Sequence, residues 1–335
     1  MGKIKFIDLF CGIGGFRFAA EELGWQCMFS SDINEECRKA YKWNFGEEPF
    51  GDITKINEKE IPDHDVLLGG FPCQPFSICG DQRGFEDTRG TLFFDIARII
   101  KEKKPKSFVL ENVKMLRGHN HGKTIARIEE VLRKLEYEVF INVLNALDFG
   151  LPQKRERIFI VGSKEKFFDF KFPSGEGAKR KSLSEILEKN IPKKFFASDS
   201  IQANRKRLHP NPHPSPSIWH ENKGGHISSY PFSCALRAGA SYNYLLVDGV
   251  RRLTPREMLR LQGFPEEFEI VCNDSQTRKQ AGNAVPVPMV KAVLDEVYRA
   301  LLLSDILLKK EYYGRPETKD CFKSKTAVPV ESISI

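Results

Sequence analysis

Residue types able to do covalent or acid–base chemistry stand directly after apolar runs that are typical of buried strands. Cys73 lies between Pro72 and Gln74-Pro75. A cysteine thiolate is a nucleophile, and nearby amides or arginines lower the pKa of such a thiol. A lone cysteine is more often structural. Here the flanking prolines and the polar, glycine-rich segment 77–90, whose composition is typical of a mobile lid, favour a catalytic one.

A carboxyl group and a pair of arginines follow later in the chain. Glu111, in Glu111-Asn112-Val113, ends another apolar run. A partly desolvated carboxyl group there could be protonated near neutrality and donate to a ring nitrogen. Strand geometry places Arg155 and Arg157 on one face, and two planar guanidinium groups suit a phosphate and a carbonyl oxygen. Each feature alone is more often structural, so the argument depends on their order along the chain.

A glycine-rich turn, Phe10–Gly15, follows the first apolar run. Glycines let a ligand approach the backbone at a helix N-terminus. The dinucleotide fingerprint needs a third glycine where Arg17 stands, which disfavours a pyrophosphate. Asp32 and Asp52 lie at strand or turn ends, where a carboxylate can accept ribose hydroxyls. A ribose without a pyrophosphate favours S-adenosylmethionine over a nicotinamide dinucleotide, and a plain structural turn is the alternative.

Alternating strands and helices are expected to position these residues. Apolar runs at 3–10, 25–30, 65–70, 107–110 and 157–161 predict strands, and helices are expected at 16–23, from 32 to 44, at 91–103 and at 123–135. This order predicts a doubly wound, mostly parallel α/β sheet. Residues 173–250 are rich in Pro, Gly, Ser, Asn and Lys and predict a smaller, irregular, mostly β domain. Further helices are expected at 253–262 and 285–303.

Composition narrows the class of protein. The chain has 335 residues, of which 41% are hydrophobic, and this excludes intrinsic disorder. No apolar run approaches the roughly 20 residues that span a bilayer, and the N-terminus has no signal-peptide pattern, so a cytoplasmic protein is expected. The net charge is +7, and residues 151–210 hold 15 Lys and Arg against 7 Asp and Glu. Such a block suits a polyanion or is a solvated face. The eight cysteines lack zinc-ligand spacing, so no metal is expected.

Together these motifs resemble the DNA (cytosine-5)-methyltransferases, most closely the short bacterial restriction–modification enzymes of the HhaI type. The resemblance covers roughly residues 3–165 and 250–300. It leaves out 173–250, where the family places its variable target-recognition region. The matching stretches stand in the family's order: Asp8–Phe16, Gly70–Gln74, Arg89–Phe93, Glu111–Val113, Gln153–Arg157, Leu253–Glu257 with Gln262–Pro265, and Gly282–Val285.

The resemblance implies methyl transfer from S-adenosylmethionine to C5 of a cytosine in a specific short sequence of double-stranded DNA. Cys73 would attack C6 and form a covalent adduct, while Glu111 protonates or hydrogen-bonds N3. Loss of the C5 proton and release of Cys73 would then restore the ring. Arg157 is expected at the cytosine O2, and Arg155 near the phosphate and the nucleophile loop. The cytosine must be flipped out of the duplex, and segment 77–90 would close behind it.

The same resemblance implies binding residues. Phe10 is expected to stack on the adenine, Asp32 to bind the ribose and Asp52 the adenine amino group. The full set expected around S-adenosylmethionine is Phe10, Gly12, Gly14, Gly15, Asp32, Ile33, Asp52, Ile53, Pro72, Leu92, Asn283, Ala284 and Val285; Asn283 is also expected to secure the hinge beside the recognition region. DNA contacts are expected from Gln74, Ser77, Arg83, Arg89, Lys223, Arg237, Tyr242 and Asn243. The family's usual threonine is missing at Cys234-Ala235-Leu236, so its base-reading contacts cannot be transferred.

The expected organisation is a catalytic domain of residues 1–172 with 281–308, a recognition domain of 173–280 and a disordered tail of 309–335. We expect a monomer in the bacterial cytoplasm, associated with the nucleoid through DNA and paired in function with a cognate restriction endonuclease. A tRNA cytosine-5 methyltransferase is the main alternative, disfavoured by the Pro-Cys-Gln motif and by the sizeable recognition region. A nicotinamide-dependent oxidoreductase would have no use for that motif. A catalytically dead DNA-binding module is hard to reconcile with intact nucleophile, acid and arginines.

Overall fold

A six-stranded sheet forms the centre of the larger part of the molecule. The computed structural model describes residues 2–72, 92–166 and 168–313. The strand order is β2-β1-β3-β4-β7-β5. β1, β2, β3 and β4 are parallel to one another, and β7 runs antiparallel to β4 and β5. The predicted mostly parallel α/β sheet is therefore confirmed. The strands are β1 (Lys5–Leu9), β2 (Gln26–Ser31), β3 (Val66–Gly70), β4 (Ser107–Val113), β5 (Glu138–Asn145) and β7 (Glu156–Ser163).

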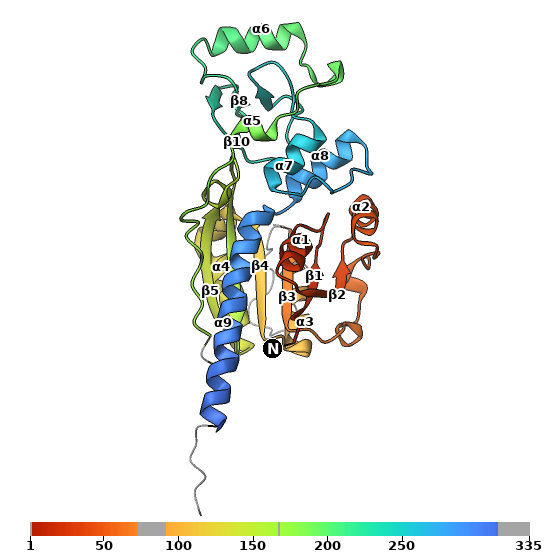
Figure 1. The fold of residues 1–335 in the computed structure, drawn as a ribbon, viewed down its shortest axis with the longest axis vertical. Coiled ribbons are helices and arrows are strands. Elements are labelled where there is room, and N and C mark those ends of the chain that lie inside the picture. Colours follow the sequence, from red (N-terminus) through yellow and green to blue (C-terminus); the bar gives the residue numbers. More distant parts are fainter. Residues whose placement is uncertain (1, 73–91, 167, 314–335) are drawn as a thin grey trace, which may run out of the picture.

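Helices cover both faces of this sheet (Figure 1). On one face, α1 (Gly15–Glu22) packs against the long α9 (Val287–Tyr313). On the other, α3 (Leu92–Lys103) and α4 (Lys123–Lys134) bury their apolar sides in a second hydrophobic cluster. α2 (Glu35–Phe45) follows β2. Single turns of 3₁₀-helix connect these elements: η1 (Ile53–Lys55), η2 (Glu58–Glu60), η4 (Lys114–Arg117), η5 (His119–Gly122), η6 (Ala146–Phe149) and η7 (Lys193–Phe195).

A smaller part with short strands lies beyond the carboxyl ends of β1, β3 and β4, at the top of Figure 1. β8 (Ile218–Glu221) is flanked by β11 (Leu245–Val247) and β9 (Ile227–Tyr230) in an antiparallel sheet, and β6 (Gln153–Lys154) pairs with β10 (Ser233–Cys234). Its helices are α5 (Leu183–Ile186), α6 (Asp199–Leu208), α7 (Pro255–Gln262) and α8 (Asp274–Asn283). Its apolar residues continue the cluster that contains α1 and α9, so the two parts share one core.

Four elements differ from the sequence-based expectation. β5 is an edge strand that sequence reasoning overlooked: five of its eight residues are apolar, but only Val139 and Leu144 are buried. α6 and α8 are short polar helices that bury few apolar side chains, and they show no amphipathic period. α9 begins at Val287 and continues to Tyr313, past the expected end at 303 and into the segment expected to be a tail.

The start of α7 follows the predicted capping pattern. Thr254 Oγ1 accepts a hydrogen bond from the amide of Glu257, and the Glu257 carboxylate accepts one from the amide of Thr254. Pro255 occupies the first helical turn, where its missing N–H costs nothing. In the described ranges, none of the helices combines the length and the apolar content that crossing a lipid bilayer requires.

Candidate active site

The turn after β1 has the backbone that its glycines predict. Phe10, Gly12 and Gly14 all have positive φ, of 56°, 55° and 86°. A Cβ on Gly14 would lie 2.2 Å from Phe45 Cε2, so only glycine fits there, whereas the space beside the Gly12 Cα is open. A strained backbone at Phe10, a non-glycine residue, is typical of a functional site. The backbone of this turn at Gly12 is therefore accessible to a ligand at the carboxyl end of β1.

Asp32 holds this turn from the end of β2. Its Oδ2 accepts a hydrogen bond from the amide of Gly12 at 2.8 Å, and its Oδ1 accepts one from the amide of Asn34 at 2.7 Å. Burial raises the pKa of the Asp32 carboxyl, and these two backbone amides oppose that rise. Each carboxylate oxygen has a second lone pair, so Asp32 can still accept hydrogen bonds from a ligand.

Two exposed apolar side chains flank Asp32. Ile33 is 72% exposed and Phe50 is 58% exposed. Phe50 stacks on Phe29 with 4.7 Å between ring centroids, and its carbonyl accepts a hydrogen bond from the amide of Asp32 at 2.9 Å. Phe50 was missed by sequence reasoning, although its place two residues before Asp52 was a usable signal. An apolar ligand group could therefore lie beside a hydrogen-bonding carboxylate.

Asp52 lies two residues after Phe50 in the chain and caps the start of η1. Its Oδ1 accepts hydrogen bonds from the amide and the hydroxyl of Thr54, at 3.0 and 2.8 Å. These hydrogen bonds lower the pKa of Asp52, so the group is an ionised acceptor at neutral pH. The neighbouring Ile53 side chain is buried in the core, so only its backbone could meet a ligand.

The ends of β3 and β4 bring residues 70–72, which lead into Cys73, close to the candidate acid Glu111. Gly70 pairs with Glu111 in the sheet, and a Cβ on Gly70 would lie 3.6 Å from Glu111 Oε2. Asn112 donates a buried hydrogen bond of 2.8 Å to the carbonyl of Phe71. This bond fixes the peptide that leads into the exposed Pro72. Cys73, Gln74, Ser77, Arg83 and Arg89 lie outside the described residues.

Glu111 and Arg157 form an ion pair at this edge. Arg157 Nε lies 2.8 Å from Glu111 Oε1, and both side chains are largely buried. Burial raises the pKa of Glu111, and the positive charges of Arg157 and Arg155 only partly oppose that rise. The carboxyl group is therefore held in one orientation and can carry a proton nearer neutrality than an exposed glutamate.

Arg155 occupies a different place from the one expected. It lies in the break between β6 and β7, so strand alternation does not continue from Arg155 to Arg157. Its guanidinium is fully buried and donates to the carbonyls of Leu236, Gly282 and Ala284 at 2.8, 3.0 and 2.8 Å. Burial lowers the pKa of Arg155 to about 9. Three of its donors are therefore committed to backbone carbonyls rather than turned toward a phosphate.

Two glutamines complete this buried polar network, which we call the hinge network (Gln153, Arg155 and Gln262). Gln153 Nε2 donates to the carbonyl of Leu261 at 2.8 Å, and its Oε1 accepts from the amide of Leu236 at 2.9 Å. Gln262 Nε2 donates to the carbonyls of Ala281 and Ala284. In the ranges that the structure covers, the exposed Asn283 side chain makes no hydrogen bond, whereas Gln153, Arg155 and Gln262 link these segments by hydrogen bonds.

Other residues expected around a cofactor lie near the same edge. A Cβ on Gly15 would meet Val285 Cγ2 at 2.7 Å, which places the last motif against the start of α1. Val285 Cγ1 also lies 3.8 Å from the position of a Cβ on Gly70. Leu92 is the first residue of α3 and is partly buried. In the described part of the chain, no group of three His, Cys, Asp or Glu side chains could hold a metal ion.

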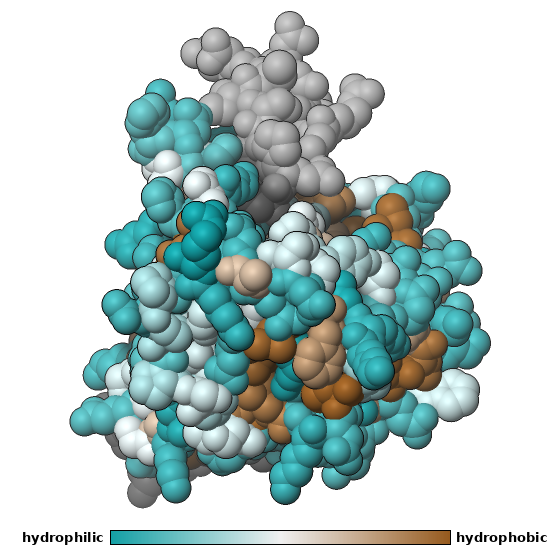
Figure 2. Space-filling model, turned by 90° about the horizontal axis from the view of Figure 1, so that it is seen from above, coloured by the Kyte–Doolittle hydropathy of each residue, from teal (hydrophilic) through white to brown (hydrophobic). Residues whose placement is uncertain are grey.

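The candidate DNA contacts of the smaller part differ in accessibility. Lys223 is exposed in the β8–β9 turn, and Arg237 and Tyr242 are exposed as well. Asn243 is only partly exposed and its Oδ1 is buried without a partner, so it is the least accessible of the four. Seen from this end, the surface is mainly hydrophilic with apolar patches between (Figure 2).

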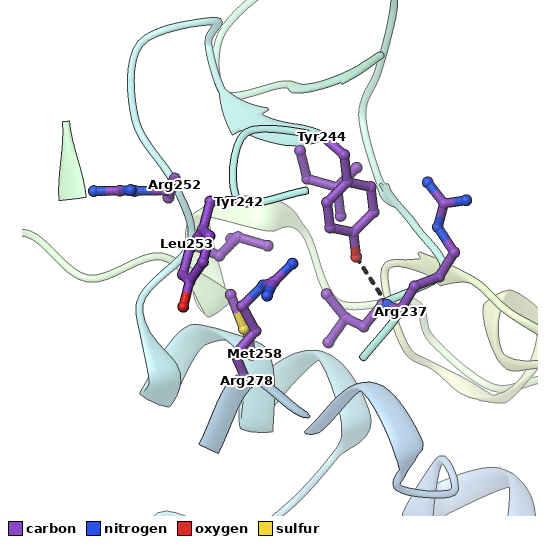
Figure 3. A pocket seen from close by; sticks show the side chains of 9 residues that line it. Arg237, Tyr242, Tyr244, Arg252, Leu253, Met258 and Arg278 are labelled. Carbon is purple, nitrogen blue, oxygen red and sulfur yellow. Dashed lines mark hydrogen bonds between the residues drawn. The ribbon is translucent and has the colours of Figure 1, made fainter. Parts of the chain in front are cut away.

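Arg237, Tyr242 and Tyr244 line a small hollow together with Arg252 and Arg278 (Figure 3). Neither Arg252 nor Arg278 was among the residues expected to contact DNA, because their place beside Tyr242 depends on the fold.

Comparisons with known proteins indicate one family. The model of the family described as C-5 cytosine-specific DNA methylase matches residues 4–299. The Type II methyltransferase M.NgoBI of Neisseria gonorrhoeae is 56% identical over 290 residues, which cover 86% of this chain and 91% of that protein. M.HaeII of Haemophilus aegyptius is 54% identical over 303 residues, covering 90% and 95%. The solved structure of the Entamoeba histolytica methyltransferase EhMeth shares the fold, with a TM-score of 0.68, 18% identity and coverage of 90% and 99%.

Proposed function

The chain belongs to the C-5 cytosine-specific DNA methylase family, and from that premise we propose that it methylates C5 of a cytosine flipped out of a specific short sequence in double-stranded DNA. The observation that carries the proposal is the buried Glu111–Arg157 pair beside the anchored peptide that leads to Cys73. The protein would act as a monomer in the bacterial cytoplasm and protect DNA against a cognate restriction endonuclease.

The residues at the carboxyl edge fit S-adenosylmethionine, which supplies an electrophilic methyl group when bound. Asp32 keeps lone pairs for the ribose hydroxyls, and the ionised Asp52 can accept from the adenine amino group. The exposed faces of Ile33 and Phe50, with Phe10, suit the flat adenine ring. The open space at Gly12 lets a ligand approach the backbone. The remaining proposed contacts are Gly14, Gly15, Ile53, Pro72, Leu92, Asn283, Ala284 and Val285.

Cys73 and Glu111 would carry the covalent chemistry. The Cys73 thiolate adds to C6 of the cytosine, forming the S–C6 bond and moving an electron pair toward C5. Glu111 donates a hydrogen bond or a proton to N3, which accepts the developing charge. Once C5 carries the methyl group, with S-adenosylhomocysteine as the leaving group, loss of the C5 proton to a base would return the electron pair to the ring and expel the Cys73 thiolate. Any proton that N3 received would return to Glu111. The aromatic ring is thereby restored.

Arg157 and Arg155 would support this chemistry in different ways. Arg157 holds Glu111 in place and has further N–H donors that suit the cytosine O2. Arg155 holds the carbonyls of Leu236, Gly282 and Ala284, so it positions the recognition segment relative to Arg157. We therefore propose that Arg155 acts as a positioning residue rather than as a phosphate contact.

The proposal is tested by incubating the protein with methyl-labelled S-adenosylmethionine and either duplex DNA or tRNA. We expect label in 5-methylcytosine of the duplex and none in tRNA; the reverse result would establish the tRNA alternative. Cys73→Ala should abolish transfer and retain sequence-dependent DNA binding. Cys79→Ala, six residues further along the chain, is the matched control and should remain active. A Cys73→Ala protein that still methylates would refute the mechanism.

A further inference from the structure

Arg237 is an exposed residue whose backbone is fixed by buried groups. The preceding residue, Leu236, donates its amide to Gln153 and gives its carbonyl to Arg155, at 2.9 and 2.8 Å. The amide of Arg237 itself donates to the hydroxyl of Tyr244 at 2.9 Å. These bonds fix the peptide on the N-terminal side of the Arg237 Cα, which reduces the conformational freedom that the residue would otherwise lose on binding a ligand.

The guanidinium of Arg237 is also oriented. It lies 4.9 Å from the centroid of the Tyr244 ring, and that ring is only 6% exposed (Figure 3). The Tyr244 hydroxyl, which accepts from Arg237, also donates to the carbonyl of Ala235. A planar guanidinium lying over a buried ring is held in a defined direction. Arg237 therefore presents a pre-oriented fork of donors rather than a freely moving charge.

The two other arginines of the hollow have a different role. Arg252 donates to the carbonyl of Lys194, and Arg278 donates to the carbonyls of Ala240 and Ser241. Both also lie against the ring of Tyr242. By contrast, within the described ranges the guanidinium of Arg237 has no hydrogen-bond acceptor and no carboxylate partner. Its donors are therefore available to a ligand.

Arg237 is also close to the catalytic edge. The carbonyl of its neighbour Leu236 accepts a hydrogen bond from the Arg155 guanidinium, which also donates to the carbonyls of Gly282 and Ala284. Arg155 in turn lies near enough to Arg157 for their positive charges to repel. A DNA duplex that delivered a cytosine to Glu111 would place its neighbouring base pairs toward Arg237. The major-groove edge of guanine, with O6 and N7, accepts two hydrogen bonds from one arginine.

We propose that Arg237 is a specificity-determining residue that donates to O6 and N7 of a guanine beside the target cytosine. This inference rests on the proposed function, because it requires a DNA substrate. A phosphate contact would need only a positive charge, which a flexible lysine supplies equally well. Loss of a guanine contact relaxes the requirement for that base, whereas loss of a phosphate contact weakens binding to all sequences alike, and that difference makes the inference testable.

The test compares wild-type protein with Arg237→Ala and Arg237→Lys. Each is incubated with S-adenosylmethionine and a library of random duplexes, and methylated sites are identified by bisulfite sequencing. We expect the wild type to require guanine at a fixed position and Arg237→Ala to lose that requirement while keeping the others. Arg237→Lys, which keeps N–H donors without the planar fork, should show a relaxed requirement. A wild type that methylates nothing would overturn the proposed function. Variants whose sequence preference equals that of the wild type would overturn only the inference.

Variants that methylate DNA too slowly for bisulfite sequencing can be compared by their affinity for DNA. The wild type should bind its site about 2- to 12-fold more weakly when 7-deazaguanine replaces the contacted guanine, because this base lacks N7 and loses one of the two hydrogen bonds. Arg237→Ala should be indifferent to that replacement. Arg207→Ala is the matched control, because Arg207 is an exposed arginine of the same part that contacts Asn204, and it should respond like the wild type. Equal sensitivity of the wild type and Arg237→Ala would contradict the assignment.

Discussion

Replacing Arg155 by methionine tests whether this arginine holds the hinge. Methionine fills a similar volume but donates no hydrogen bond. Three carbonyls accept from Arg155, and of these Ala284 keeps a second donor in Gln262. The carbonyls of Leu236 and Gly282 would lose the donor that Arg155 supplies. A buried unsatisfied group costs about 1–3 kcal/mol, and removal of a desolvated cation partly offsets that cost. We therefore expect the free energy of unfolding to fall by about 3 kcal/mol.

Urea unfolding with linear extrapolation measures this change, and two variants serve as comparisons. Arg155→Lys keeps the charge without the fork and should recover part of the lost stability. Arg157→Met should lose methylation with a smaller loss of stability, because Glu111 can become protonated when its partner is removed. If Arg155→Met unfolds at the wild-type urea concentration, the guanidinium does not hold the hinge and the reasoning is refuted.

Two further predictions concern pH. Glu111 acts in its protonated form, so the rate of methyl transfer should fall as pH rises through the raised pKa of Glu111. Glu111→Gln should lower that rate by about 10²- to 10⁴-fold and lose that dependence; an unchanged profile of rate against pH would exclude Glu111 as the acid. Asp8 is fully buried with both carboxylate oxygens unpartnered, and burial raises its pKa well above the ordinary value. The folded state therefore holds a proton that the unfolded state releases, so Asp8 makes stability fall as pH rises from about 4 upward. Asp8→Asn should flatten this slope in urea unfolding at a series of pH values, and a slope equal to that of the wild type would contradict the account.

Local sequence patterns predict the strands and helix starts that are determined by residues close together in the chain. Apolar runs ending in glycine or a polar residue predict β1, β3 and β4, and the Thr254 capping box predicts the start of α7. The polar helices α6 and α8 carry no such pattern, since few of their apolar side chains meet the core. Edge strand β5 does carry an apolar run, of which only Val139 and Leu144 are buried, and sequence reasoning overlooked it. Burial on one face is therefore the signal on which sequence reasoning depends.

The candidate site divides in the same way. Glu111 and Arg157 could be predicted because each stands in a recognisable motif on a strand of the sheet. The position of Arg155 could not, because its acceptors lie about 80 to 130 residues away in the chain. The break between β6 and β7 also depends on a pairing with β10 that no local pattern shows. Contacts between distant segments thus decide which of two adjacent arginines faces the site.

The central claim is that Cys73 carries cytosine-5 methylation of a specific DNA sequence. Expression of the wild type and of Cys73→Ala in a bacterium without cytosine methylation, followed by bisulfite sequencing of its DNA, tests this claim most directly. We predict protected cytosines within one short sequence for the wild type and none for Cys73→Ala. Absence of protected cytosines with folded wild-type protein, or equal protection by Cys73→Ala, would contradict the account.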